Sequence, residues 1–339
     1  MAHGSRTAHS DRNRHGTDRH QATSFWVLLL EPAHTIRREV GIEALSQPLA
    51  AYTALAALSV VLFGLFLRIT RLTAGWLPYR TWLVMLPPVL VALWLGVWAW
   101  AFLITMLSIY GFKEFARATG LYRERLFVLT VYLAMVAANA LAYFGRFGLF
   151  MVVPMWGVAL LTLAPIMRNK TEGMLQGFAL SALGIVYFCW FLAHLTYLAT
   201  WDAGLGLVLY VVLATQLNDV VGFLFGKLFG RRHWTALSPN KTVAGSLGAL
   251  VFGIIFAFVN WQLAFPQLPW WGVLGLGAIV GAGGQIGDLT LANFKRNVGI
   301  KDFGNLLPGH GGVLDRLNSL TLVAPLALHF VRFFFGGFP

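Results

Sequence analysis

The stretch LYVVLATQLNDVVGFLFGKLFG, residues 209–230, decides the fold. It is mostly apolar and long enough to cross the roughly 30 Å of a bilayer core as a helix. One carboxylate, Asp219, lies inside this run. Because a charged group at membrane depth costs free energy, Asp219 is a candidate functional residue, with a structural salt bridge as the alternative.

The rest of the chain repeats this pattern. Of its 339 residues, 58% are apolar and 11% are charged, compared with about 25% charged in a soluble domain. Long apolar runs lie near residues 48–67, 82–112, 126–144, 147–167, 175–198, 203–226, 243–261, 271–294 and 318–335. We predict an all-α polytopic integral membrane protein with about nine transmembrane helices, which excludes a soluble enzyme, a disordered chain and a fibrous repeat. Pro87 and Pro88 predict a kink or a re-entrant start in the over-long second run.

The Lys and Arg residues predict an orientation. Nine spans place the two chain termini on opposite sides. The N-terminal segment and the loops 113–125, 168–174, 227–242 and 295–317 together hold 20 of the 25 Lys and Arg residues. The positive-inside rule then places the N-terminus and these loops in the cytoplasm. One miscounted span before residue 227 would move the N-terminus to the other side but would leave the last two loops together.

The densest polar stretch is DLTLANFKRNVGIKDFGNLLPGHGGVLDR, residues 288–316. On a helix, Asp288 and Lys295 fall on one face, seven residues apart. Carboxylates that hold a divalent cation beside Lys and Arg are typical of phosphoryl and nucleotidyl transfer. Glycines on both sides of His310 would let backbone N–H groups approach a phosphate. This stretch therefore predicts a site that binds phosphate.

A second cationic cluster lies in GRRHWTALSPNKTVAGS, residues 230–246. Ser238, Asn240, Lys241 and Thr242 stand where the next span begins. Hydroxyl and N–H groups at a helix start suit a phosphate, and the lysine adds positive charge. The spacing is not that of a Walker A loop, and a cationic loop flanking the membrane is the alternative interpretation.

Four glycines, at positions 277, 281, 283 and 287, form two pairs with the small-xxx-small spacing. This spacing is typical of helices that pack with their backbones close together in a membrane. We therefore predict close helix packing along 271–294 and assign these glycines no chemistry.

The stretch KRNVGIKDFGNLLPGHGGVLDRLNS, residues 295–319, resembles the C-terminal signature of the phosphatidate cytidylyltransferases, also called CDP-diacylglycerol synthases. The matching positions are Lys295, Arg296, Lys301, Asp302, Pro308, His310, Gly311, Gly312, Asp315 and Arg316. SPNKT at 238–242 resembles the Ser-Pro-x-Lys-Thr motif of the family, and NDVVGFLFGKLFG at 218–230 resembles its span with an internal Asp. The resemblance is specific across roughly residues 215–320.

Three positions depart from the family pattern. The Ser of the signature is Ala292, the Asp after the Asp-Arg pair is Asn318, and the residue after Lys-Thr, commonly Trp, is Val243. Any hydroxyl contact from residue 292 and any carboxylate contact from residue 318 is therefore lost or altered. These departures leave open a paralogue that binds or modifies another lipid phosphate.

The resemblance implies a nucleotidyltransferase that moves a cytidylyl group from CTP to phosphatidate, giving CDP-diacylglycerol and pyrophosphate in phospholipid biosynthesis. The catalytic residues that it implies are Asp219, Asp288, Asp315, Lys295 and Arg296. The three carboxylates would hold one or two Mg²⁺ ions, and a further monovalent cation is allowed. The substrate-binding residues that it implies are Ser238, Asn240, Lys241, Thr242, Lys301, Asp302, His310, Gly311, Gly312 and Arg316.

The expected partners are CTP, phosphatidate and membrane lipids, with no nucleic acid and with a homodimer allowed. The expected location is a membrane of the bacterial inner type, with the active-site loops in the cytoplasm. We divide the chain into a polar tail with a candidate interfacial helix (1–45), N-terminal transmembrane helices (46–200) and a C-terminal transmembrane catalytic region (201–339). A membrane transporter stays open as a less favoured class, because intramembrane carboxylates also serve transport, although the chain shows no convincing internal repeat.

Overall fold

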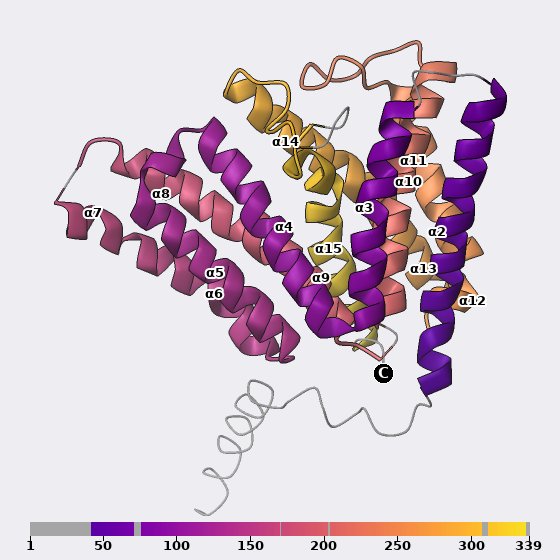
Figure 1. Ribbon diagram of the computed structural model, residues 1–339, viewed down its shortest axis with the longest axis horizontal. Helices are drawn as coiled ribbons and strands as arrows, with labels where there is room; N and C mark the ends of the chain where they lie inside the picture. The colour runs from indigo at the N-terminus through magenta and orange to yellow at the C-terminus, as the bar shows by residue number, and fades with distance from the viewer. Residues whose placement is uncertain (1–41, 71–75, 170, 203, 307–310, 337–339) are drawn as a thin grey trace, which may run out of the picture.

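The computed structural model describes residues 42–70, 76–169, 171–202, 204–306 and 311–336 (Figure 1). Within these residues the secondary structure is helical and no strand forms. Seven stretches of the described chain are helices long and apolar enough to cross a membrane, and Tyr79–Leu95 and Val243–Val259 are shorter apolar helices. The prediction of an all-α polytopic membrane protein is confirmed.

The helices, in chain order, are α2 (Ile42–Thr70), α3 (Trp76–Leu95), α4 (Val97–Ala118), α5 (Arg125–Tyr143), α6 (Phe147–Leu161), α7 (Leu163–Arg168), α8 (Met174–Leu183), α9 (Phe191–Ala199), α10 (Gly204–Phe229), α11 (Val243–Val259), α12 (Trp261–Ala264), α13 (Trp270–Ala278), α14 (Gly284–Asn297) and α15 (Leu314–Phe335). Two π-helical segments, Gly184–Trp190 and Ile279–Gly283, connect α8 to α9 and α13 to α14 without a break. Each of these pairs therefore forms one long helix.

The over-long run near 82–112 is two helices, α3 and α4, which meet at Gly96. Gly96 has φ of +102°, a conformation that glycine adopts without the clash that a Cβ would cause. Pro87 and Pro88 lie inside α3. The helix break therefore lies at the glycine, and α3 continues through the two prolines.

This break divides the second predicted span into two helices. Because the chain then crosses the molecule once more, α2 begins at the end opposite to the one predicted. The ring of Tyr52, early in α2, lies 6.2 Å from the ring of Tyr210, early in α10. The two helices therefore start at the same end, opposite the 227–242 loop (Figure 1). The sequence predicted that the N-terminal part of the chain lies on the same side of the membrane as the 227–242 loop, and for the start of α2 this prediction is wrong. The predicted tail before residue 42 lies outside the described residues.

The glycine pairs bring helices into backbone contact, as predicted. A Cβ added to Gly277 would lie 2.6 Å from the Cα of Ile254, so α13 packs directly on the backbone of α11. A Cβ added to Gly287 would lie 2.6 Å from the carbonyl oxygen of Asn318, so α14 packs equally closely on α15. The glycines therefore serve two different neighbours, and the second contact lies beside the polar residues of α14.

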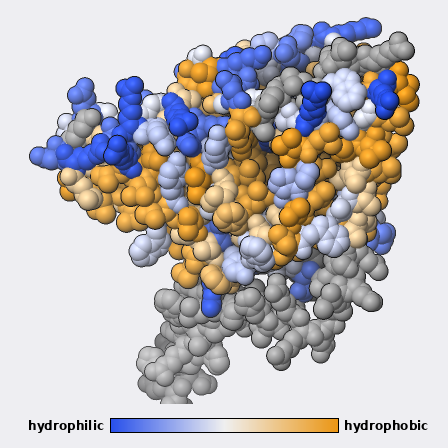
Figure 2. Space-filling view, viewed as in Figure 1, coloured by the Kyte–Doolittle hydropathy of each residue, from blue (hydrophilic) through white to orange (hydrophobic). Residues whose placement is uncertain are grey.

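The surface fits a multi-pass membrane protein. An apolar band crosses the middle of the molecule, and hydrophilic side chains gather at the end that carries the 227–242 loop (Figure 2). Large apolar side chains such as Phe223 and Trp156 are 71% and 64% exposed. An exposed apolar band of this extent marks contact with lipid.

Candidate active site

A cavity of about 630 Å³ lies beneath the 227–242 loop, between α10, α11, α14 and α15. The predicted site residues that line it are Asp219, Ser238, Asn240, Lys241, Thr242, Asp288, Asp315 and Arg316. These residues come from three separate stretches of sequence. The structure therefore brings together the Asp-containing span, the Ser-Pro-Asn-Lys-Thr loop and the C-terminal motif, as the sequence predicted.

An ion pair forms part of the cavity wall. The Nζ of Lys241 lies 2.7 Å from Asp288 Oδ2 and 3.1 Å from Gln285 Oε1. The other oxygen of Asp288 accepts a hydrogen bond of 2.6 Å from the Nδ2 of Asn318. The Lys241 and Asp288 side chains are 17% and 29% exposed, so the pair stays accessible from the cavity.

Local sequence explains this geometry. Gln285 and Asp288 stand three residues apart on α14, so both face Lys241. Thr242 caps α11, because its Oγ1 accepts a 3.1 Å hydrogen bond from the backbone N–H of Gly245. This cap fixes the chain immediately after Lys241. Thr242 lines the cavity as predicted, although its hydroxyl is already engaged by the cap.

Asp219 reaches the same cavity from α10. Its Oδ2 accepts a hydrogen bond of 2.8 Å from the hydroxyl of Ser319 on α15. Asn218, the residue before it, is fully buried, and its Nδ2 donates to the carbonyl of Gly281 at 3.3 Å. These contacts fix the polar turn of α10 against α15 and the π-helical segment, so the intramembrane carboxylate has a defined position.

Asp315 has a different environment. Its Oδ1 lies 2.9 Å from the Nζ of Lys295, and its Oδ2 accepts hydrogen bonds from the backbone N–H groups of Phe303 at 3.0 Å and Gly312 at 2.9 Å. The Asp315 side chain is 2% exposed. Both oxygens therefore have donors, and this carboxylate ties the loop after α14 to the start of α15.

The hydrogen bonds of Asp219, Asp288 and Asp315 can be compared with what a divalent cation requires. Within the part of the chain that the structure describes, no three His, Cys, Asp or Glu side chains form a metal-binding group. Mg²⁺ commonly uses one or two protein carboxylates together with water and substrate phosphates. Asp219, Asp288 and Asp315 all line one cavity. Both oxygens of Asp288 and both oxygens of Asp315 already have protein donors, whereas a single hydrogen bond, from Ser319, reaches the Oδ2 of Asp219. The assignment of these three carboxylates to Mg²⁺ stays a prediction.

The helices that form this cavity lie within a region that matches a known protein family. The model of the Cytidylyltransferase family matches residues 77–334, which include most of α3 and nearly all of the chain through α15. The chain belongs to the cytidylyltransferase family.

Three relatives illustrate this family membership. The phosphatidate cytidylyltransferase of Staphylococcus haemolyticus (strain JCSC1435) is 36% identical over 168 residues, covering 49% of this chain and 63% of the relative. That of Staphylococcus aureus (strain COL) is 36% identical over 160 residues, covering 47% and 60%. The uncharacterized protein YnbB of Escherichia coli (strain K12) is 29% identical over 243 residues, covering 70% and 80%. The chain thus spans less than two thirds of the two staphylococcal relatives that it matches.

Other predicted residues of this family member lie away from the cavity wall, namely Lys295, Arg296, Lys301, Asp302, Gly311 and Gly312. Lys295 forms an ion pair with Asp315, and Gly312 donates its backbone N–H to the same carboxylate. Arg296, Lys301 and Asp302 are exposed at the end of α14 and in the loop after it. His310 lies outside the described residues.

One departure from the family pattern has a structural role that the sequence did not show. Asn318 joins α14 to α15, since its Nδ2 donates to Asp288 and its Oδ1 accepts from the backbone N–H of Ser319 at 2.8 Å. Ala292 is buried on α14, one helical turn beyond Asp288. The amide at position 318 therefore holds a cavity carboxylate where the family has an acidic side chain.

Several cavity residues were missed from the sequence. Trp82, Lys227, His233 and Gln285 all line the cavity. Lys227 stands in the Phe-Gly-Lys part of the family resemblance, and Gln285 stands one helical turn before Asp288. The sequence could therefore have predicted both as cavity residues. It could not have predicted Trp82, because only the packing of α3 brings that side chain to the cavity.

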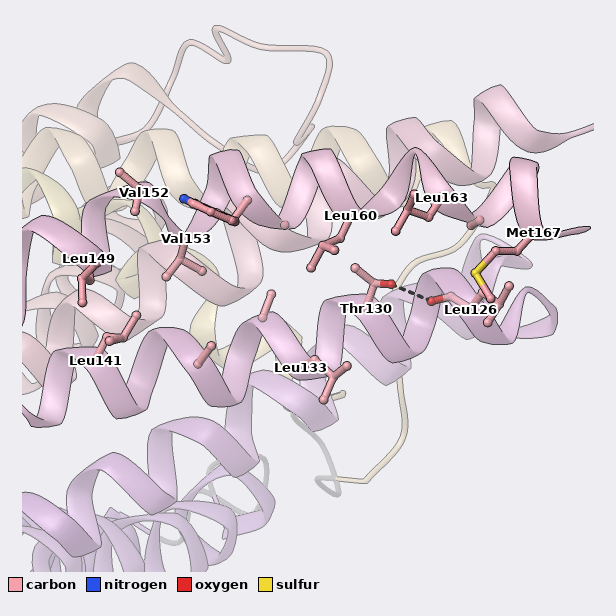
Figure 3. A pocket seen from close by; sticks show the side chains of 15 residues that line it. Leu126, Thr130, Leu133, Leu141, Leu149, Val152, Val153, Leu160, Leu163 and Met167 are labelled. Carbon is pink, nitrogen blue, oxygen red and sulfur yellow. Dashed lines mark hydrogen bonds between the residues drawn. The ribbon is translucent and has the colours of Figure 1, made fainter.

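A second cavity, of about 460 Å³, lies between α5, α6 and α7. Figure 3 shows its walls, which are built from side chains such as Leu133, Val153 and Leu160. None of its lining residues is charged, and the hydroxyl of Thr130 is used in a 2.9 Å hydrogen bond to the carbonyl of Leu126. This cavity therefore lacks the charged groups that would bind a nucleotide, whereas the first cavity has them.

Proposed function

We propose that this member of the cytidylyltransferase family transfers a cytidylyl group from CTP to phosphatidate, giving CDP-diacylglycerol and pyrophosphate. The observation that carries the proposal is the cavity in which Asp219, Asp288 and Lys241 meet at the polar end of a membrane-spanning bundle. Phosphatidate cytidylyltransferases among the relatives support the choice of substrates.

The reaction needs charge neutralisation more than proton transfer. A phosphate oxygen of the lipid attacks the α-phosphorus of CTP and forms the new P–O bond. The bond between that phosphorus and the bridging oxygen breaks, and pyrophosphate leaves with the electron pair. Because the attacking phosphate is already ionised near pH 7, it needs no general base. The protein then acts by orienting the two polyanions and by offsetting their charge.

The cavity supplies groups for both tasks. We assign to Lys241, Lys227 and Arg316 the binding of the triphosphate and the lipid phosphate, since all three line the cavity and carry positive charge. Asp219 and Asp288 would hold Mg²⁺, which when bound neutralises phosphate charge and polarises the phosphoryl oxygens. Ser238 and Asn240, on the loop above, offer hydrogen bonds to phosphate or sugar.

The cavity walls suit a substrate pair of mixed polarity. Val220 and Phe223 line the cavity and are also 52% and 71% exposed on the apolar outer surface. Phosphatidate can therefore enter from the bilayer with its acyl chains against this wall. CTP can enter from the water at the polar end of the molecule, where the 227–242 loop lies over the cavity.

We place the cavity end in the cytoplasm of a membrane of the bacterial inner type. The segments 113–125, 168–174, 227–242 and 295–317 hold 14 of the 25 Lys and Arg residues. At the opposite end of the described chain, Arg146 lies in the loop between α5 and α6, and Arg332 lies in the last turn of α15. This asymmetry still favours the positive-inside orientation after the correction at α2.

The test is pyrophosphate release by the purified protein in detergent with Mg²⁺, CTP and phosphatidate. We expect release only when all three are present. Asp288→Asn keeps the shape of the side chain but removes its charge, and it should lower kcat about 10²- to 10³-fold while the protein stays folded. Release without phosphatidate, or full activity in the folded variant, would contradict the proposal.

A second candidate is transfer to a different lipid phosphate, which Asn318 favours because an amide replaces the family carboxylate beside Asp288. The same assay separates the two candidates when phosphatidate is replaced by other phosphorylated lipids. CTP-dependent release that prefers another lipid over phosphatidate supports the second candidate and excludes the first.

A further inference from the structure

A buried carboxylate of α4 contacts the start of α15. Glu114 is 7% exposed, and its neighbour Phe115 is 2% exposed. Its Oε2 accepts a 2.9 Å hydrogen bond from the backbone N–H of Leu314, and its Oε1 accepts one of 3.2 Å from Val313. A buried carboxylate is costly unless it is hydrogen-bonded. The two amide donors therefore determine where this side chain lies.

The surroundings of Glu114 are shaped for a carboxylate. The first N–H groups of a helix have no acceptor within the helix, and negative charge is favoured there. A Cβ added to Gly304 or Gly312 would collide with the carboxyl group of Glu114. Two turns of the loop between α14 and α15 thus leave a space that this carboxylate fills, and the contact joins a helix of the N-terminal half to the C-terminal motif.

The residues next along the chain belong to the cavity. Asp315 follows Leu314 directly, holds Lys295 and lines the cavity. Arg316 also lines the cavity and comes from the same turn. The backbone that Glu114 holds therefore sets the direction of an acidic and a basic cavity side chain.

We propose that Glu114 is a positioning residue of the active site, which fixes the first turn of α15 so that Arg316 and Asp315 face the cavity. Its effect on turnover rests on the proposed function. Its effect on the backbone does not, since the two hydrogen bonds form between parts of the protein alone.

The test uses Glu114→Gln, which keeps the size of the side chain but places an amide donor against one of the two backbone donors. Hydrogen exchange followed by mass spectrometry should show exchange in the segment 312–317 that is about tenfold faster or more. The kcat/KM for pyrophosphate release should fall by about tenfold. Asn139→Ala is the matched control, because Asn139 is buried on α5 and accepts a 2.6 Å hydrogen bond from Thr196. It should lower thermal stability without changing exchange at 312–317.

A double-mutant cycle with Arg316→Lys separates positioning from general destabilisation. If Glu114 acts through Arg316, Glu114→Gln should lower kcat/KM by a much smaller factor in the Arg316→Lys background than in the wild-type protein. An equal fold-loss of kcat/KM in both backgrounds, or an unchanged rate of hydrogen exchange in residues 312–317, would overturn the proposal. If the wild-type protein releases no pyrophosphate from CTP, the proposed function fails, and the exchange measurement alone then decides whether Glu114 holds this turn.

Discussion

Gly287 lies where α14 touches α15, and an added methyl group there tests how closely the two helices must pack. In Gly287→Ala, the new Cβ would lie 2.6 Å from the carbonyl oxygen of Asn318 and 3.1 Å from the Cα of Ser319. Both atoms belong to the backbone of α15, so no side-chain rotation relieves the contact. The helices must move apart.

The size of the movement follows from these distances. Ordinary van der Waals contact begins near 3.4 Å, so the 2.6 Å contact requires about 0.8 Å of separation. The hydrogen bond from Asn318 to Asp288 crosses the same helix pair at 2.6 Å. A separation of this size would stretch it to about 3.4 Å, beyond the usual range for a hydrogen bond. We expect overpacking to cost about 1–3 kcal/mol of stability and the displaced carboxylate to cost about tenfold to a hundredfold in kcat.

The assay is CTP-dependent pyrophosphate release, measured beside thermal unfolding in the same detergent. Gly283→Ala is the matched control, since its Cβ would lie 3.4 Å from Leu326 and 3.5 Å from Val323, which is ordinary contact with the same helix α15. We expect this control to keep near wild-type activity. Equal activity and equal melting temperature in the two variants would show that the α14–α15 contact does not position Asp288.

Three further predictions concern the polar contacts of the cavity. Lys295→Met leaves a buried carboxylate without its cation and should cost about 3 kcal/mol of stability, whereas Arg296→Met at the exposed neighbouring position should leave the melting temperature nearly unchanged. Thr242→Ala removes the cap of α11 and should cost about 1 kcal/mol, measured by thermal unfolding; no loss would mean that the cap is not formed. Asn318→Asp places a second carboxylate beside Asp288, so it should melt lower than wild type in EDTA and gain more from added Mg²⁺; an equal Mg²⁺ response in both proteins would argue against a cation at this place.

Much of the site could be predicted because charge is expensive in a membrane. Asp219 and Asp288 stand out in apolar sequence, and the cations around Lys241 stand out for the same reason. Their meeting in one cavity needed only the helix order and the family resemblance. The role of Gly287 was predictable in kind, since small residues four apart indicate close packing, although the sequence did not say that its partner would be α15.

The remaining features depend on contacts between distant parts of the chain. Gly96 resembles many glycines in apolar sequence, and only the packing of α3 beside α4 shows that its positive φ separates two helices. Glu114 looked like a residue of a loop flanking the membrane, because its partners, Val313 and Leu314, lie about 200 positions later. Asp315 has three donors, and the sequence did not show that two of them are backbone N–H groups, those of Phe303 and Gly312.

The charges of the cavity explain why one carboxylate can be replaced by an amide. Asp219 and Asp288 both line the cavity where polyanionic substrates would bind, and each accepts a hydrogen bond from a side chain of α15. A further carboxylate at position 318 would repel Asp288 unless a cation or a proton lay between them. The neutral amide of Asn318 instead donates to Asp288 and fixes its direction without a cation. In this chain, therefore, a hydrogen bond from α15 holds one oxygen of Asp288 while the other pairs with Lys241, so protein groups alone orient this carboxylate.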